Sequence, residues 1–418
     1  MTSTTAPARR QAGGASRLRV WGERLDSPVA TYYLLLSLTA ALVVFGLIMV
    51  LSASAIVSLD RTRSAYTIFL PQAVYAAVGA VALLVASRIP VLGWKRLAVP
   101  VLVLGIGLQL LVFTPLGDAF QGNRNWIRLG PVSLQPSEVL KVGLVLAGGA
   151  VLARKRRHLS SFTHVLVPYL VPMVATAVAA VILGHDLGTV MVMGAIVAGV
   201  LFAAGIPLRW FAIAAVPFIG MVVAFVVTSP NRLGRFDVWL GRDTDEWGAA
   251  RQPLHGRYAL ADGGWLGLGL GQSREKWGLL SEPHNDFIFA IIGEELGLPG
   301  SLAILLLFGG LALTCYRLVS RSDDFFVRVV TAGIMTWIIV QAGVNIGAVI
   351  GLLPVIGVPL PLVSSGGSSL ITTMGALGIL LSFARHEPGC ADALRARSSS
   401  LRRSMAVVSG AVRRGRAS

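Results

Sequence analysis

Long apolar blocks alternate along this chain with short polar segments rich in Arg, Gly or Pro. Ten blocks approach the roughly 20 residues that an α-helix needs to cross the hydrocarbon core of a bilayer. The pattern therefore predicts an all-α, polytopic membrane protein with ten transmembrane helices. We place these helices near residues 32–56, 69–88, 97–115, 136–153, 164–183, 188–206, 211–228, 298–317, 327–350 and 370–385.

Composition supports this class of protein, because 55% of the 418 residues are hydrophobic and only 13% are charged. A soluble chain carries roughly a quarter of its residues as charges. The sequence leaves little room for a separate water-soluble domain, so we predict one membrane domain over residues 29–386. The first block is longer than a signal-peptide core and follows about thirty residues, so we expect it to remain as a helix. The Arg-, Ser- and Ala-rich tails, 1–28 and 387–418, are typical of disordered basic segments.

Basic residues are distributed unevenly among the polar segments. If the N-terminus is cytoplasmic, the cytoplasmic segments hold most of the Lys and Arg, including the run Arg154–Arg157 and the tail from Arg385 to Arg416. The short segments on the other side are nearly free of them, as the positive-inside rule requires. We therefore predict that both termini are cytoplasmic. Topology also explains the net charge of +16, so no nucleic-acid partner is needed.

One segment on the predicted outer side is far longer than the others, from about residue 229 to 287. Segments of this length in compact proteins are usually functional or disordered. This one carries several aromatic residues, among them Trp239, Trp265 and Trp277. We therefore favour an ordered loop on the membrane face over a flexible linker.

The first polar constellation that interrupts the apolar pattern lies between the third and fourth predicted helices. Glu138 and Lys141 are three residues apart at the start of a helix, so they can pair on one face. Such a pair inside a membrane is either a functional site or a structural ion pair. Arg124 and Arg128 precede that helix, and guanidinium groups suit a diphosphate. The alternative for these two arginines is an anchor to lipid headgroups.

The second and third constellations lie at predicted helix starts on the outer side. Asp186 either caps the following helix or faces a shared cavity, and capping alone is the more economical interpretation. His284 and Asp286 close the long loop, and Asp286 is a candidate general base or, alternatively, a cap. Glu294 and Glu295 follow shortly after.

The fourth constellation, Pro359–Ser369, separates the last two predicted helices. Its two prolines prevent a continuous helix, and non-helical backbone at membrane depth is tolerated only beside protein or a watery cavity. We therefore predict a cavity-lining, anion-binding segment rather than a plain turn. Its candidate binding residues are Ser364, Gly366, Gly367 and Ser368. No metal-ligand spacing is present among the six histidines, although a divalent cation could assist a reaction.

Taken in order, these constellations resemble the motifs of the SEDS family (shape, elongation, division and sporulation), which are polytopic peptidoglycan polymerases. The matching stretches are Trp126–Lys141, Asp186–Thr189, His284–Glu295 and Pro359–Ser369. The chain departs from the usual motifs at Asn125, His185, Asn285 and Ser365. The run around Glu294 and Glu295 looks more like the division branch (FtsW) than the elongation branch (RodA).

The resemblance implies a glycosyltransferase of the cell membrane that polymerises lipid II, a disaccharide-pentapeptide on undecaprenyl diphosphate, by inverting β-1,4 transfer at the division septum. It implies that Asp286 is the catalytic base. Arg124, Arg128, Lys141 and the serine–glycine segment are then candidates for substrate binding, together with Glu138, Asp186 and His284. The implied partners are a class B penicillin-binding transpeptidase and other division proteins. Alternatives are the same polymerase in elongation, a lipid flippase or transporter, and a non-catalytic scaffold.

Overall fold

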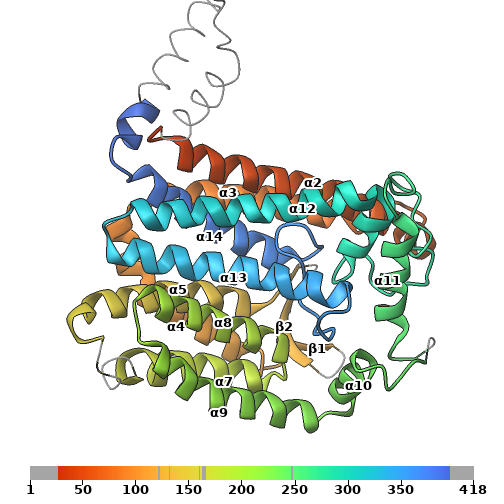
Figure 1. Ribbon diagram of the computed structural model, residues 1–418, viewed down its shortest axis with the longest axis horizontal. Helices are drawn as coiled ribbons and strands as arrows, with labels where there is room; N and C mark the ends of the chain where they lie inside the picture. The colour runs from red at the N-terminus through yellow and green to blue at the C-terminus, as the bar shows by residue number, and fades with distance from the viewer. Residues whose placement is uncertain are drawn as a thin grey trace, which may run out of the picture.

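A computed structural model describes residues 27–120, 123–130, 132–159, 161, 166–245 and 248–395. Most of its helices run side by side along the long axis of the molecule (Figure 1). Every predicted apolar block forms a helix, within a few residues of the expected bounds except at one start. These helices are α2 (Ala30–Thr62), α3 (Phe69–Ala86), α4 (Val91–Leu111), α5 (Pro136–Arg154), η2 (Leu166–Ala175) with α7 (Thr176–Leu183), α8 (Leu187–Ala203), α9 (Leu208–Val227), α12 (Ile288–Arg321), α13 (Phe325–Val349) and α14 (Gly367–Arg385).

Eight of the described helices are long and apolar enough to cross a membrane, and two further apolar helices, Tyr169–Leu183 and Leu187–Ala203, are shorter. The first of these short helices begins as a π-helix, η2, with Pro172 inside it. Proline has no N–H to donate and displaces the carbonyl one turn back, which accounts for the irregular start. The fold is thus a polytopic helical bundle.

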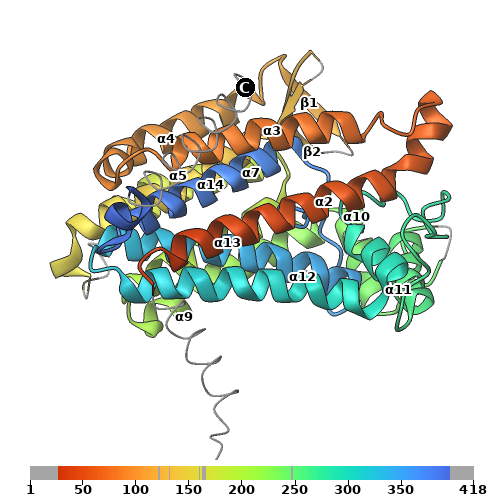
Figure 2. The same cartoon turned by 90° about the horizontal axis from the view of Figure 1, so that it is seen from above.

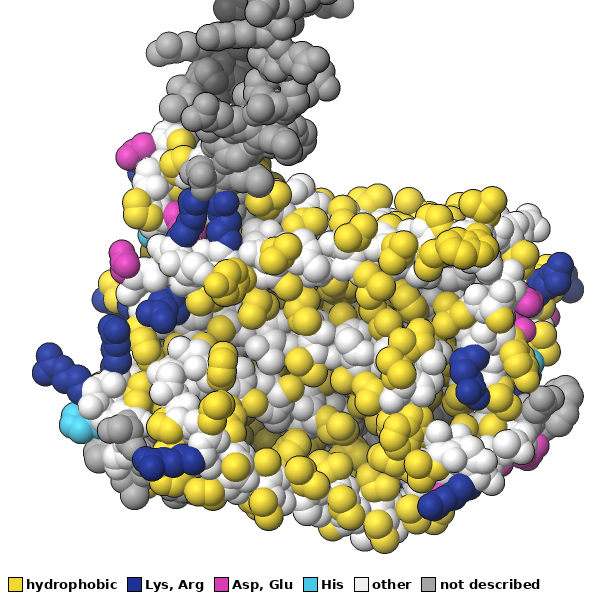
Figure 3. Space-filling model, in the orientation of Figure 1, with side chains coloured by type: hydrophobic (Ala, Val, Ile, Leu, Met, Phe, Trp, Pro, Cys, Tyr) yellow, Lys and Arg dark blue, Asp and Glu magenta, His cyan; other side chains and the backbone are white. Residues whose placement is uncertain are grey.

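On the face shown in Figure 3, apolar side chains cover the middle, while charged side chains gather toward the two ends. Helix α9 buries only Val226 among its twenty residues. In contrast, most of the side chains of α5 and α14 are buried inside the bundle. An apolar exterior around a packed interior is expected where lipid replaces water as the solvent.

Small residues let α4 and α5 approach closely. A Cβ added to Gly143 would lie 2.7 Å from the Cα of Leu102, and one added to Gly105 would lie 3.1 Å from the Cα of Leu140. Lipid tails are as apolar as leucine, so membrane helices associate through such close backbone packing. This contact fixes the start of α5, where Glu138 and Lys141 lie.

A small antiparallel sheet between α4 and α5 is an addition to the predicted helical fold. Its strands are β1 (Gly117–Phe120), β2 (Asn123–Leu129) and β3 (Val132–Leu134), in the order β1-β2-β3. Along β2 the side chains of Asn125 and Ile127 are buried, whereas Arg128 is exposed, the period-two pattern of a half-buried strand. The strands are too short for this alternation to be recognised beside the long apolar blocks.

The long loop contains two helices, α10 (Pro230–Trp239) and α11 (Arg251–Gly263), in agreement with the prediction of an ordered segment. Both lie at one end of the bundle with the small sheet (Figure 2). The following helix, α12, begins at Ile288, ten residues before the predicted start at 298. The backbone of Gly297 has φ 63° there, and Pro299 follows, so these two residues kink the helix. The apolar pattern places the helix start at this kink, because the glycine and the proline interrupt it there.

Two buried glutamates hold the long loop against α12. Glu294 accepts hydrogen bonds from the Ser273 hydroxyl at 2.5 Å and from the Arg274 amide at 2.6 Å. Glu295 lies 2.8 Å from the ammonium group of Lys276 and accepts a hydrogen bond from a hydroxyl on α2. Both carboxylates are almost fully buried, so they are structural anchors of the loop.

The predicted tails, 1–28 and 387–418, lie mostly outside the described residues. Within 387–395, Glu387 is buried and accepts a hydrogen bond from the Thr31 hydroxyl of α2 at 3.2 Å. Cys390 is buried as well. Packing against the bundle therefore continues a few residues past the predicted boundary at 386.

Candidate active site

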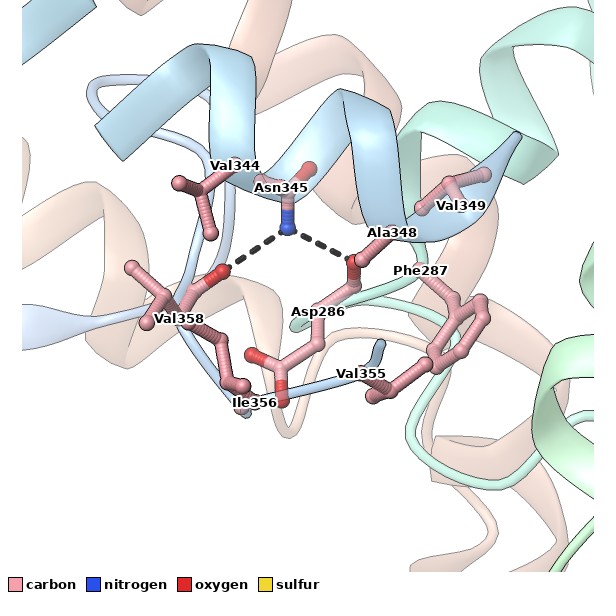
Figure 4. Close-up of a pocket in the computed structure, with 10 residues that line it drawn as sticks. Asp286, Phe287, Val344, Asn345, Ala348, Val349, Val355, Ile356 and Val358 are labelled. Atoms are coloured by element: carbon pink, nitrogen blue, oxygen red, sulfur yellow. Dashed lines mark hydrogen bonds between the residues drawn. The ribbon is translucent and has the colours of Figure 1, made fainter. Parts of the chain in front are cut away.

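The side chain of Asn345, on α13, joins two segments that are far apart in the sequence. Its amide nitrogen donates hydrogen bonds to the carbonyl oxygens of Asp286 and Val358, both at 2.8 Å (Figure 4). Asn345 is only 3% exposed, so these bonds form away from solvent. They fix the end of the long loop and the segment after α13 relative to one helix.

Asp286 lies at this junction, two residues before α12, and its carboxylate points into a small cavity (Figure 4). Asp286 and Asn345 supply the polar side chains of its lining, and the other lining residues are apolar or glycine. Burial raises the pKa of Asp286 to about 6, an effect that the positive charge of Arg235 opposes and the negative charge of Glu282 reinforces. The residues lining the cavity are Asp286, Phe287, Val344, Asn345, Ala348, Val349, Val355, Ile356, Gly357 and Val358.

Arg235, from α10 in the long loop, is the cation that acts on Asp286. A Cβ built on Gly357 would lie 3.6 Å from an Asp286 carboxylate oxygen and 3.8 Å from the Nη1 of Arg235. The carboxylate and the guanidinium therefore approach the same glycine. Gly357 has φ +74°, a conformation that side chains rarely adopt, and the missing side chain keeps the space between the two charges open.

His284 lies two residues before Asp286 and is buried, with 6% of the residue exposed. Its Nε2 lies 3.3 Å from the carboxylate of Glu282, and its Nδ1 has no hydrogen-bond partner among the described residues. Burial lowers the pKa of His284, although Glu282 opposes this effect. Burial therefore favours the neutral form of the ring.

The serine–glycine segment forms the non-helical connection from α13 to α14, as predicted. The Ser364 hydroxyl donates to the carbonyl of Asn285 at 2.7 Å and accepts from the amide of Leu360 at 2.8 Å. The amide of Ser365 donates to the carbonyl of His284 at 2.9 Å. This segment thus supports the backbone that carries Asp286.

Other donors of this segment are also engaged with protein. The amide of Gly366 donates to the side chain of Gln72 at 3.2 Å, and a Cβ on Gly367 would clash with the ring of Tyr75. The hydroxyl of Ser368 accepts a hydrogen bond from the Gln135 amide at 3.1 Å. The cavity at Asp286 is lined instead by residues 355–358 of the same connection.

Glu138 and Lys141 form the predicted ion pair, with 2.8 Å between Nζ and Oε1 and side chains 3–4% exposed. Lys141 also donates to Gln341 at 3.1 Å and lies 4.7 Å from the ring centroid of Trp337, both on α13. Glu138 accepts a hydrogen bond from Thr372 of α14 at 3.2 Å. The pair therefore connects α5, α13 and α14.

The remaining candidates lie at the small sheet and the start of α8. Asp186 caps α8 by accepting the Thr189 amide at 2.9 Å, as the capping interpretation predicted, and Gln135 donates to it at 3.3 Å. Arg124 donates to the carbonyl of Thr114 at 2.8 Å. Arg128 pairs with Asp118 at 2.8 Å and is largely exposed.

Among the site residues predicted from the sequence, Asp286, His284 and Ser364 lie together in the structure. The other predicted site residues lie elsewhere and make separate contacts. Sequence reasoning missed Asn345, Arg235 and Gly357. An asparagine within an apolar helix is itself a signal for a buried polar contact, and it could have identified Asn345. Among the described residues, no group of three or more His, Cys, Asp or Glu side chains is placed to hold a metal ion.

A family of cell cycle proteins that includes FtsW, RodA and SpoVE matches residues 32–388. The chain belongs to this family. It is 41% identical over 394 residues to the probable peptidoglycan glycosyltransferase FtsW of Mycobacterium tuberculosis, an alignment that covers 94% of this chain and 75% of the relative. Stage V sporulation protein E of Bacillus subtilis is 35% identical over 84% of this chain and 96% of its own length.

Solved structures show the same fold. A chain from a peptidoglycan synthase complex that coordinates polymerization and crosslinking superposes with a TM-score of 0.69 and 26% identity, covering 85% of this chain and 98% of that one. The rod shape determining protein RodA of Thermus thermophilus superposes with a TM-score of 0.62 and 25% identity, over 85% and 96% of the two chains. The relatives named FtsW support the predicted division branch of the family.

The buried pair generates a prediction. Lys141→Ala leaves the carboxylate of Glu138 without a counter-charge, and breaking a buried pair costs about 3–5 kcal/mol. We expect a clearly lower thermal unfolding temperature of the purified protein in detergent. Lys95→Ala is the matched control, because the Lys95–Asp324 pair is more than a third exposed and such a pair contributes about 1 kcal/mol or less.

The double variant Glu138→Gln, Lys141→Met separates structure from function. It removes both charges, so the unfolding temperature should recover in part. If the pair also serves catalysis, glycan synthesis will stay low in the refolded double variant. Full activity there would leave the pair with a structural role only.

Proposed function

We propose that this chain is a peptidoglycan glycosyltransferase that polymerises lipid II into glycan strands during septal wall synthesis. Its family and its relatives named as peptidoglycan glycosyltransferases support this activity. The observation that carries the proposal is the carboxylate of Asp286, which faces a cavity beside the guanidinium of Arg235. A carboxylate and a cation in one site suit a reaction in which a proton leaves and a diphosphate departs.

In the proposed reaction, the 4-hydroxyl of the acceptor sugar attacks the anomeric carbon of the donor sugar. Asp286 accepts the hydroxyl proton as the new C–O bond forms, and the bond from the anomeric carbon to the lipid diphosphate breaks. Attack from the opposite face inverts the configuration and gives a β-1,4 linkage. A positioned base contributes about 10²- to 10⁴-fold to such a step.

The pKa of Asp286, raised by burial to about 6, suits this role. At neutral pH most of the carboxylate is ionised, and it is more basic than an ordinary aspartate in water. A catalytic base works best when its pKa lies close to the operating pH. Arg235 keeps the pKa from rising further and so preserves the ionised form.

We propose that ten helices cross the membrane with both termini in the cytoplasm. Eight helices satisfy the length and apolarity of a span, and the two shorter ones lie parallel to them in the same bundle (Figure 1). In this orientation the long loop, the small sheet and Asp286 share the outer face. The sugars of lipid II are then polymerised outside the cytoplasm.

A transpeptidase is the proposed partner. One similar structure belongs to a complex that coordinates polymerization with crosslinking. By analogy, this chain acts with a class B penicillin-binding protein and other division proteins, and the two enzymes together build crosslinked wall. The serine–glycine segment, Arg124 and Arg128 remain candidates for contact with substrate on weaker grounds.

The base assignment predicts the behaviour of Asp286→Asn. Asparagine keeps the size of the side chain but cannot accept the hydroxyl proton, so we expect glycan synthesis to fall at least 100-fold. The measurement is polymer formed from labelled lipid II by the purified protein, with and without its transpeptidase. Thermal unfolding should remain close to that of the wild type.

Asp262→Asn is a suitable control, because Asp262 is an exposed carboxylate on α11 of the same loop. Glu282 is unsuitable, since it contacts His284 and Asn285 and influences Asp286. A wild-type rate in purified Asp286→Asn would exclude this residue as the base. Glu294 and Glu295 are poor replacements, because both are buried in loop contacts. Wild-type protein that translocated lipid II without polymer would instead indicate a flippase.

The raised pKa predicts a pH dependence. The base must be ionised, so activity is full above the pKa and is lost as the pH falls through about 6. We expect the polymerisation rate at limiting lipid II to drop about tenfold for each pH unit below that value. A rate that stays constant between pH 7 and pH 5, with the protein still folded, would contradict the assignment.

The topology can be tested with reporter fusions. Fusions within residues 230–283 should report an extracytoplasmic position, whereas fusions at Arg157 or after Arg385 should report the cytoplasm, because the clusters of basic residues stay inside. The readout is a pair of reporters active on opposite sides of the membrane. A cytoplasmic signal from the long loop would refute the ten-helix arrangement.

A further inference from the structure

A second cavity adjoins the one at Asp286 and has no role in the proposed base chemistry. It shares Ala348 and Val355 with the first cavity. The wall between the two is thus the end of α13 and the connection that follows it. Its lining residues are Arg235, Val238, Trp239, Pro253, Arg257, Ala348, Gly351, Leu353, Pro354 and Val355.

Among the described residues, the charged side chains that line this cavity belong to two arginines. Arg235 comes from α10 and Arg257 from α11, so both helices of the long loop contribute one guanidinium each. Neither guanidinium pairs with a carboxylate among the described residues, and no Asp or Glu lines the cavity. The Nη1 of Arg235 makes only a long contact with the carbonyl of Val355, at 3.5 Å, and the Nε of Arg257 lies 3.4 Å from the carbonyl of Pro253.

Two arginines that line one otherwise apolar cavity suit an anion with several oxygens. Guanidinium forks match phosphate oxygens with two parallel hydrogen bonds, and such charge-assisted bonds are about twice as strong as neutral ones. A diphosphate offers oxygens to both arginines at once.

The position of the second cavity indicates which of the two lipid II molecules, the donor or the acceptor, supplies the diphosphate. In the proposed reaction the diphosphate of the donor is attached to the carbon that is attacked, so it must lie close to the base. The diphosphate of the acceptor is a disaccharide away from the attacking hydroxyl. Arg235 approaches both Gly357, beside Asp286, and the second cavity, and therefore lies where the donor diphosphate has to be.

The arginines selected from the sequence are less suited to this task. Arg124 donates to a backbone carbonyl, Arg128 pairs with Asp118, and Lys141 is buried against Glu138. Each of these charges already has a partner, and none lines either cavity. We propose that the cavity between α10, α11 and α13 binds the diphosphate of the lipid-linked donor through Arg235 and Arg257, an inference that rests on the proposed function.

The test measures binding separately from turnover. Purified full-length protein in nanodiscs is titrated with undecaprenyl diphosphate, with undecaprenol and with inorganic pyrophosphate. Arg235→Gln and Arg257→Gln should each weaken binding of undecaprenyl diphosphate about tenfold or more, since each removes a charge-assisted contact. Binding of undecaprenol should not change. Arg257→Lys should restore part of the affinity.

Arg242→Gln is the matched control. Arg242 lies in the same loop, is 72% exposed and lines neither cavity. Its substitution should leave binding and polymerisation unchanged. Polymerisation assays on the same samples should show a raised KM for lipid II in Arg257→Gln, because this residue holds the donor and does not touch the proton.

Three results would overturn the inference. The first is wild-type affinity for undecaprenyl diphosphate in both glutamine variants. The second is equal affinity of the wild type for undecaprenol and undecaprenyl diphosphate. The third is equal affinity for pyrophosphate and undecaprenyl diphosphate, which would make the cavity a site for free phosphates. If the wild type makes no glycan but the binding results hold, the proposed function fails and the diphosphate site stands.

Discussion

The side-chain amide of Asn345 is the contact on which the arrangement at the loop end of the bundle depends. One nitrogen holds the carbonyls of Asp286 and Val358, and so joins the start of α12 to the connection between α13 and α14. Asn345 is almost fully buried, and its amide supplies the donor that the two carbonyls need. Gln341, one turn earlier on α13, donates in the same way to the carbonyl of Pro359. A polar stripe on one helix therefore satisfies a backbone that cannot be helical.

These contacts explain how the long loop holds the carboxylate of Asp286 in a defined position. The loop is anchored at Glu294 and Glu295, and its last residues are anchored by Asn345 and Ser364. Asp286 is thereby fixed at the edge of an apolar cavity, where burial raises its pKa and the nearby Arg235 limits the rise. The same loop carries Arg257 on its second helix, so one segment supplies the base and both cations.

The helices could be predicted because lipid imposes a minimum apolar length, and that length is visible in a single sequence. The pair of Glu138 and Lys141 and the cap at Asp186 were also predictable, since both depend on spacing within one helix. Other features depend on tertiary contacts. The three-stranded sheet is too short to leave a clear pattern, and the start of α12 was masked by the kink at Gly297. Arg235 and Arg257 look like ordinary loop arginines until the fold places them beside a cavity.

The family resemblance identified Asp286, and the physical reasons for its position come from the fold. We propose that Asp286 accepts the proton of the attacking hydroxyl and contributes little to the binding of lipid II. The most direct measurement compares, in one preparation of Asp286→Asn, the affinity for lipid II with the rate of glycan formation. The account predicts binding within a few-fold of the wild type and almost no polymer. Loss of binding in parallel with loss of polymer, or polymer formed at the wild-type rate, would contradict it.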